Sequence, residues 1–142
     1  MSYTILDHPA DVKFRTTGAT LEEAFVNIVD AMASIVGSRD IINQHDKSGL
    51  QHEIKIKAES KEALLFDFLD QLILLQDLED SIVSHAEDLT IVETEAMYTL
   101  SAMIVVQPIP PGEAFLDIKA PTYSEMRIES NDGWILDAVL DI

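Results

Sequence analysis

Much of this chain divides into stretches in which apolar and polar residues alternate with a period of two. Alternation of this kind, with many β-branched residues, is typical of strands that bury one face. The strands predicted in this way are residues 3–6, 12–17, 50–58, 82–95, 96–107, 118–129 and 134–140. Turn-forming residues separate the later strands. Residues 108–112 contain three prolines, and residues 130–133 end in the Asp-Gly pair favoured in hairpins.

Two other stretches have the three- and four-residue spacing of amphipathic helices. The first begins after Thr20, which can form a capping box with Glu23, and ends at Gly37, a residue suited to a left-handed C-terminal cap. The second follows Ser60 as its N-cap and has a wide apolar stripe over residues 64–75. The order of these elements predicts an α+β fold, in which two helices pack on a largely antiparallel or mixed β-sheet system.

Length and composition fit a single domain spanning residues 1–142. Hydrophobic residues make up 47% of the chain, which argues against disorder. The chain has no cysteine, so disulfides, thiolate zinc sites and cysteine nucleophiles are excluded. Because it has neither an apolar run of membrane-spanning length nor a secretory leader, we expect a cytoplasmic protein without membrane contact.

The formal net charge of −17 is the strongest signal in the composition. A surface this acidic repels phosphate backbones, so direct binding to nucleic acid is not expected. The charge suits cation binding or steering toward a basic protein partner. A solvated acidic surface, adapted to a salty or acidic cell, is the simpler explanation.

Acidic residues lie near both ends of the chain. Asp7, His8 and Asp11 fall within five residues between two predicted strands, and Asp141 follows the last strand. If the two ends meet, their carboxylate oxygens suit calcium, magnesium or manganese rather than soft metals. Among 26 acidic residues, however, ordinary strand-end carboxylates are the default explanation. The isolated glycines form no phosphate-binding loop, and no serine stands in a nucleophile elbow.

Lys119 is a further candidate, because lysine is scarce in this chain and this one interrupts a predicted strand. One interpretation is a snorkelling lysine that pairs with one of the many carboxylates. The other places its ammonium beside the acidic residues, where it would hold them or reach a partner's phosphate or carboxylate.

Five motifs together resemble the archease family over essentially the whole chain. Each is short, and it is their order and spacing that make the resemblance specific. The motifs are Asp7-His8-Pro9-Ala10-Asp11, residues 18–25 before the first helix, Phe66-Asp67-Phe68-Leu69, Lys119-Ala120-Pro121-Thr122-Tyr123, and Asp132-Gly133-Trp134 with the ending Leu140-Asp141-Ile142.

The resemblance implies an accessory protein of tRNA splicing and RNA repair that activates an RtcB-type 3′-phosphate RNA ligase. Such a protein promotes guanylylation and multiple turnover of the ligase and is not itself an enzyme. The family's metal site falls on the side chains of Asp11 and Asp141 and on the main-chain oxygen of Ile142, and its functional lysine falls on Lys119. Calcium is the favoured divalent cation, and magnesium and manganese are the alternatives.

Asp7 and His8 are neighbours of this set, and the resemblance assigns them no role. Two other functions stay open. One is a chaperone or modulator of tRNA-modifying enzymes, and the other is a metal-dependent hydrolase that uses Asp7, His8 and Asp11. Pro121 stands where relatives usually have a β-branched residue, and we expect it to end strand pairing beside Lys119.

Overall fold

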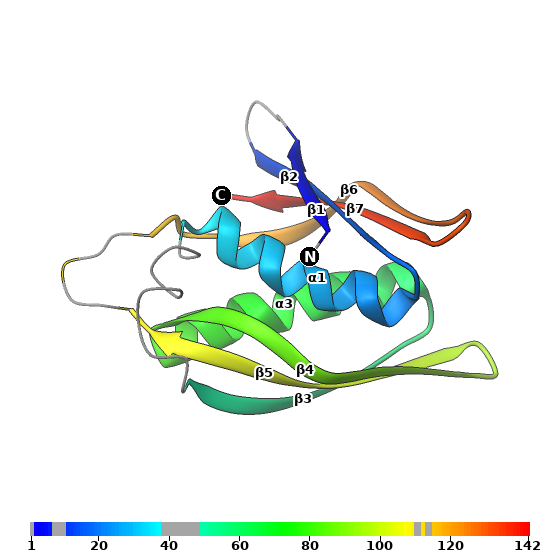
Figure 1. Cartoon of the computed structure of the whole chain (residues 1–142), viewed down its shortest axis with the longest axis horizontal. Helices are drawn as coiled ribbons and strands as arrows, with labels where there is room; N and C mark the ends of the chain where they lie inside the picture. Colours follow the sequence, from blue (N-terminus) through cyan, green and yellow to red (C-terminus); the bar gives the residue numbers. More distant parts are fainter. Residues whose placement is uncertain (1, 7–10, 38–48, 110–111, 113–114) are drawn as a thin grey trace.

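The chain forms three layers, with helices α1 and α3 between two antiparallel sheets (Figure 1). The structure is a computed structural model that describes residues 2–6, 11–37, 49–109, 112 and 115–142. One sheet has four strands in the order β1-β2-β7-β6, and the other has three in the order β3-β5-β4. The elements are β1 (Tyr3–Leu6), β2 (Asp11–Gly18), α1 (Leu21–Ile35), β3 (Leu50–Ala58), α3 (Lys61–Glu79), β4 (Ser81–Thr94), β5 (Met97–Pro108), β6 (Ala120–Ser130) and β7 (Trp134–Asp141).

These elements confirm the predicted α+β class. Both described helices begin at the predicted caps. The Thr20 hydroxyl accepts a hydrogen bond from the Glu23 N–H at 3.1 Å, and the Ser60 hydroxyl accepts one from the Ala63 N–H at 3.0 Å. The Glu23 carboxylate accepts from the N–H of Ala19 at 3.3 Å, one residue before the cap, rather than from that of Thr20 as in a standard capping box.

Both helices contact strands of each sheet, which is why apolar residues cover more than one of their faces. Phe25 of α1 and Phe68 of α3 meet edge to face, with ring centroids 5.4 Å apart. One continuous core therefore joins the two sheets through the helices. Its largest fully buried side chains are Phe14, Phe25, Phe68, Ile28, Met32, Leu64, Leu65, Leu69, Leu72, Leu100, Ile104 and Leu136.

The pairing expected between the two long strands is confirmed in β4 and β5, and the predicted 130–133 turn joins β6 to β7. The expectation for Pro121 was wrong, because Pro121 pairs opposite Leu140 and the ladder continues to Thr122. Strand β6 lies at the edge of its sheet, where a residue without an N–H is tolerated since one side of the strand has no partner. No helix among the described residues is both long and apolar enough to cross a membrane.

Candidate functional site

The first residue of β2 and the last residue of β7 lie opposite each other. These strands are antiparallel, and their register runs from Asp11 opposite Asp141 to Gly18 opposite Trp134. Directly opposed residues on one sheet face have Cβ atoms about 4.5–5.5 Å apart. The expected meeting of the two acidic ends is therefore confirmed for Asp11 and Asp141, which lie 130 residues apart in the sequence.

Lys119 lies on the other side of β7. Its backbone N–H donates to the carbonyl oxygen of Asp141 at 2.9 Å, and its side chain is exposed. Strand β6 begins at the next residue and places Ala120 opposite Asp141. Three neighbouring strands, in the order β2-β7-β6, thus bring Asp11, Asp141 and Lys119 together. We call Asp11, Asp141, Ile142 and Lys119 the acidic tip.

The acidic tip has the donor atoms of a hard-cation site. Two opposed carboxylates repel each other, and a divalent cation between them would remove this repulsion. With the main-chain oxygen of Ile142, the donors would all be oxygen, as calcium, magnesium and manganese prefer. Within the described part of the chain, no group of three or more His, Asp or Glu side chains could hold a metal ion. Asp7 and His8 lie outside the described residues, so their placement beside the tip stays a prediction.

A buried carboxylate lies on the same sheet face, two rows from the tip. Successive side chains of a strand point to opposite faces, so Asp137 and Asp141 of β7 share a face with Asp11 and Arg15 of β2. The Asp137 side chain is only 3% exposed. It accepts two hydrogen bonds from Arg15, from Nε at 2.7 Å and from Nη2 at 3.1 Å. This bidentate pair joins β2 to β7.

Arg127 of β6 extends this pair across the third strand. We call Arg15, Asp137, Arg127 and Glu129 the charged row. Arg127 lies opposite Asp137, with Nη1 3.8 Å from the Asp137 carboxylate, and it donates a hydrogen bond to Glu129. The hydrogen bond to Asp137 raises the pKa of Arg15, and the hydrogen bond between Arg127 and Glu129 raises the pKa of Arg127 and lowers that of Glu129. Each charged form is thus stabilised by its neighbour. The row ties together the three strands that position the acidic tip.

Sequence reasoning missed this row. Asp137 is a single carboxylate within the apolar run of β7, and Arg15 and Arg127 occupy strand positions that an alternation pattern assigns to solvent. A lone acid in a predicted buried strand, in a chain with only nine Lys and Arg residues, was the signal that could have revealed it.

A bulge in β6 joins the tip to α3. Pairing with β7 is interrupted between Thr122 and Arg127, and the Thr122 hydroxyl donates to the Val139 carbonyl at 3.0 Å. Within the bulge, Tyr123 stacks on Phe66 of α3 with centroids 4.3 Å apart, and Glu125 pairs with Lys13 of β2 at 3.2 Å. Two of the motifs quoted above, those containing Phe66 and Lys119, are therefore in contact.

Comparison with known proteins decides the family. The model of the Archease protein family matches residues 3–142. The chain belongs to the archease family. Protein archease of Pyrococcus abyssi is 32% identical over 140 residues, covering 96% of this chain and 95% of that protein. Protein archease of Methanosarcina barkeri is 33% identical over 146 residues, covering 99% and 95%.

Solved structures share the archease fold. The solution structure of protein 1598 from Methanobacterium thermoautotrophicum has a TM-score of 0.79 at 24% identity and covers 99% of both chains. The crystal structure of an archease from Thermotoga maritima, described as a possible chaperone, has a TM-score of 0.60 at 17% identity and covers 96% of this chain and 94% of that one. At these identities the likeness shows the fold, and the function has to be argued from the site.

Proposed function

We propose that this archease activates an RtcB-type 3′-phosphate RNA ligase in tRNA splicing and RNA repair, by presenting a divalent cation at its acidic tip. The protein promotes guanylylation and multiple turnover of the ligase and catalyses no reaction itself. The observation that supports this proposal is the register of β2 and β7, which places Asp11 opposite Asp141. The choice of a ligase as partner rests on what the resemblance to the archease family implies.

In this proposal the Asp11 and Asp141 carboxylates and the main-chain oxygen of Ile142 hold the cation. Calcium is favoured, because it accepts mixed carboxylate and carbonyl oxygens in flexible geometry, and magnesium and manganese are the alternatives. The cation supplies positive charge that can bind phosphate oxygens. Lys119, directly before the neighbouring strand β6, supplies a second positive charge for the ligase or its nucleotide. The ligase is activated only as far as the protein binds its guanylylation-competent state more tightly than the other states.

The direct test is guanylylation of the ligase under single- and multiple-turnover conditions, with and without a chelator. Asp11→Ala and Asp141→Ala are expected to reduce the stimulation at least tenfold, on the order of the losses seen when metal-site residues are removed. Asp70→Ala is a matched control, because Asp70 is an exposed aspartate of α3 and lies outside the tip. Undiminished stimulation by both tip variants would exclude the proposed mechanism.

A chaperone of tRNA-modifying enzymes is the second candidate, supported by the description of the Thermotoga maritima structure as a possible chaperone. A general chaperone protects unrelated proteins from aggregation, and this protection needs neither Asp11 nor Asp141. Aggregation assays with two unrelated client proteins, using the same variants, therefore separate the two functions. Turnover of a phosphoester without any partner would instead favour the hydrolase.

A further inference from the structure

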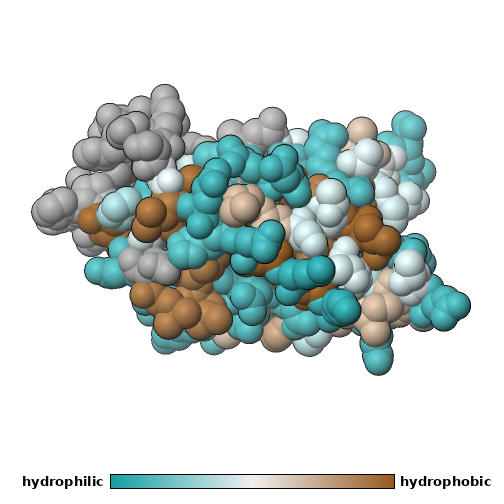
Figure 2. All heavy atoms as spheres, turned by 90° about the horizontal axis from the view of Figure 1, so that it is seen from below, coloured by the Kyte–Doolittle hydropathy of each residue, from teal (hydrophilic) through white to brown (hydrophobic). Residues whose placement is uncertain are grey.

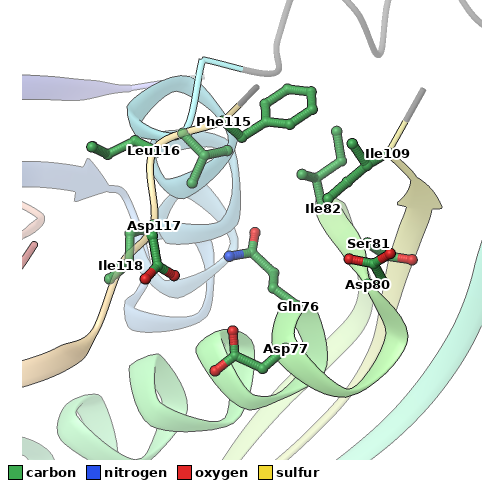
Figure 3. A pocket seen from close by; sticks show the side chains of 11 residues that line it. Gln76, Asp77, Asp80, Ser81, Ile82, Ile109, Phe115, Leu116, Asp117 and Ile118 are labelled. Atoms are coloured by element: carbon green, nitrogen blue, oxygen red, sulfur yellow. The ribbon is translucent and has the colours of Figure 1, made fainter. Parts of the chain in front are cut away.

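A cavity of about 240 Å³ opens at the end of the molecule where both described helices finish (Figure 3). Helices α1 and α3 run in the same direction, so their C-terminal ends lie at one end of the molecule (Figure 1). We call this the end cavity. The described residues that line it are Val36, Gln76, Asp77, Asp80, Ser81, Ile82, Ile109, Phe115, Leu116, Asp117 and Ile118.

The described lining of the end cavity combines apolar side chains with polar and acidic ones. The exposed carboxylates are Asp77, Asp80 and Asp117, and none of the described lining residues is basic. Figure 3 shows Asp77 and Asp117 on one side, with Ile118 beside Asp117. The Gln76 side chain lies in the middle, and Phe115, Ile82 and Ile109 lie on the other side. The cavity thus combines an apolar wall with three negative charges.

Two helix ends add to this negative potential. Val36 is the C-cap of α1 and Asp80 is the C-cap of α3, and the C-terminal end of a helix has a partial negative charge. Helices usually have Lys, Arg or His in this position, but neither helix has a basic residue in its last turn. This concentration of like charge is unfavourable in the isolated protein, and a cation from outside would relieve it.

Size and spacing limit what this cation can be. Among the described residues no group of three or more His, Asp or Glu side chains could hold a metal ion, so Asp77, Asp80 and Asp117 do not form a three-carboxylate metal site. Pockets for drug-sized ligands and cofactors measure about 300–1,000 Å³, so the end cavity is small for such a ligand. A long side chain with an apolar stem and a cationic head matches both the wall and the rim.

We propose that the end cavity binds an arginine side chain of a partner protein. The guanidinium is weakly hydrated, pairs with carboxylates through several donors and packs on aromatic faces such as that of Phe115. Lysine matches less well, because its strongly hydrated ammonium is a single point charge. This site is separate from the acidic tip and does not depend on the ligase proposal.

An exposed leucine in the cavity wall indicates what flanks the arginine. Leu116, one of the residues that line the cavity, is 42% exposed. Figure 2 shows a largely hydrophilic face with apolar side chains in several separate places, the most extensive group toward one end. We therefore expect apolar residues next to the arginine. A second copy of this chain is a poor occupant, because two molecules of net charge −17 repel each other.

The probe is an acetylated, amidated peptide with one arginine between leucines, compared with the same peptide carrying neutral citrulline. Binding is followed by NMR through the methyl groups of Ile82, Ile109 and Ile118, with the full-length protein. We expect these methyl signals to shift and the arginine peptide to bind roughly tenfold (about 1.4 kcal/mol) more tightly than the citrulline peptide, since a hydrogen bond to a charged group is stronger than one between neutral groups.

Variants then separate the cavity from the overall charge. Asp77→Asn with Asp117→Asn is expected to weaken arginine-peptide binding about tenfold. Two control variants are expected to change the affinity for the arginine peptide by no more than about twofold. Asp70→Asn removes one charge from α3 outside the cavity, and Asp141→Ala removes one at the acidic tip. An unchanged methyl spectrum and thermal midpoint in the double variant would verify that it still folds.

The proposal is overturned if the citrulline peptide binds as tightly as the arginine peptide, or if the double variant binds like the parent protein. Equal weakening by Asp70→Asn would show nonspecific attraction to an acidic surface. Methyl shifts that depend on protein concentration and occur without peptide would show a second copy in the cavity. Because the readout is peptide binding, it can fail while ligase stimulation succeeds, or the reverse.

Discussion

Asp137 is nearly buried within an apolar strand, and two arginines on the neighbouring strands compensate its charge. The side chains of Arg15 and Arg127 are 37% and 45% exposed, whereas that of Asp137 is 3% exposed. The Asp137 carboxylate therefore depends most on its partners. The row also selects the register of the four-stranded sheet. A slip of one residue would move Asp137 and Asp141 to the opposite, helix-covered face.

Removing this carboxylate is expected to destabilise the protein. Asp137→Ala takes away both hydrogen bonds from Arg15, and because both arginines can still reach water the expected loss is roughly 2 kcal/mol in the free energy of unfolding. Urea denaturation followed by circular dichroism measures it. Glu129→Gln, which removes an exposed charge of the same row, is expected to leave the stability nearly unchanged. Equal stability of Asp137→Ala and the parent protein would contradict the structural role of the row.

At the scale of elements, the starts of the two helices and the turn between β6 and β7 were easier to predict than the turn between β4 and β5. The Thr20 and Ser60 caps and the Asp132-Gly133 turn follow from local chemistry, because each residue supplies a hydrogen bond or a backbone conformation that its own segment needs. Between β4 and β5 the turn residues are Glu95 and Ala96, with φ of 39° and 65°. Neither residue favours positive φ, so the long pairing on both sides imposes this turn.

Ala96→Gly is therefore expected to stabilise the protein. Glycine adopts a positive φ without a Cβ clash, and relief of this strain should exceed the extra freedom that glycine gives the unfolded chain, for a gain of about 0.5–1 kcal/mol. Thermal unfolding measures the change. Ala102→Gly, in the buried middle of β5, serves as the opposite case and should lower the midpoint. A lower midpoint for Ala96→Gly as well would show that the turn is not strained.

At the scale of the molecule, one side chain joins α3 to both sheets. The Lys61 ammonium lies 5.2 Å from the ring centroid of Tyr98 in β5 and 5.8 Å from that of Trp134 in β7. A lysine in the first turn of a helix opposes the helix dipole, and the two aromatic faces offset this cost. The contact spans the three layers at the end opposite the helix C-termini.

Lys61→Ala is expected to lower the free energy of unfolding by about 1 kcal/mol, through loss of both cation–π contacts. Because Trp134 is the single tryptophan of the chain, its fluorescence reports the same contact and should change in the variant. Lys61→Arg is expected to keep most of the stability, since arginine also packs on aromatic faces. Lys57→Ala, at an exposed position of β3, is the surface control, and a loss as large as that of Lys61→Ala would refute a specific contact.

The sequence by itself determined the elements and their class, because period, caps and turn residues act within a few positions of one another. It also identified Asp11, Lys119 and Asp141 as the residues to examine. Only the tertiary structure decided that Asp11 and Asp141 lie opposite each other, that Asp137 is buried between two arginines, and that two helix C-termini meet at one acidic cavity. These features join residues far apart in the chain. Their positions follow from strand register and layer packing, which no local pattern of hydrophobic and polar residues encodes.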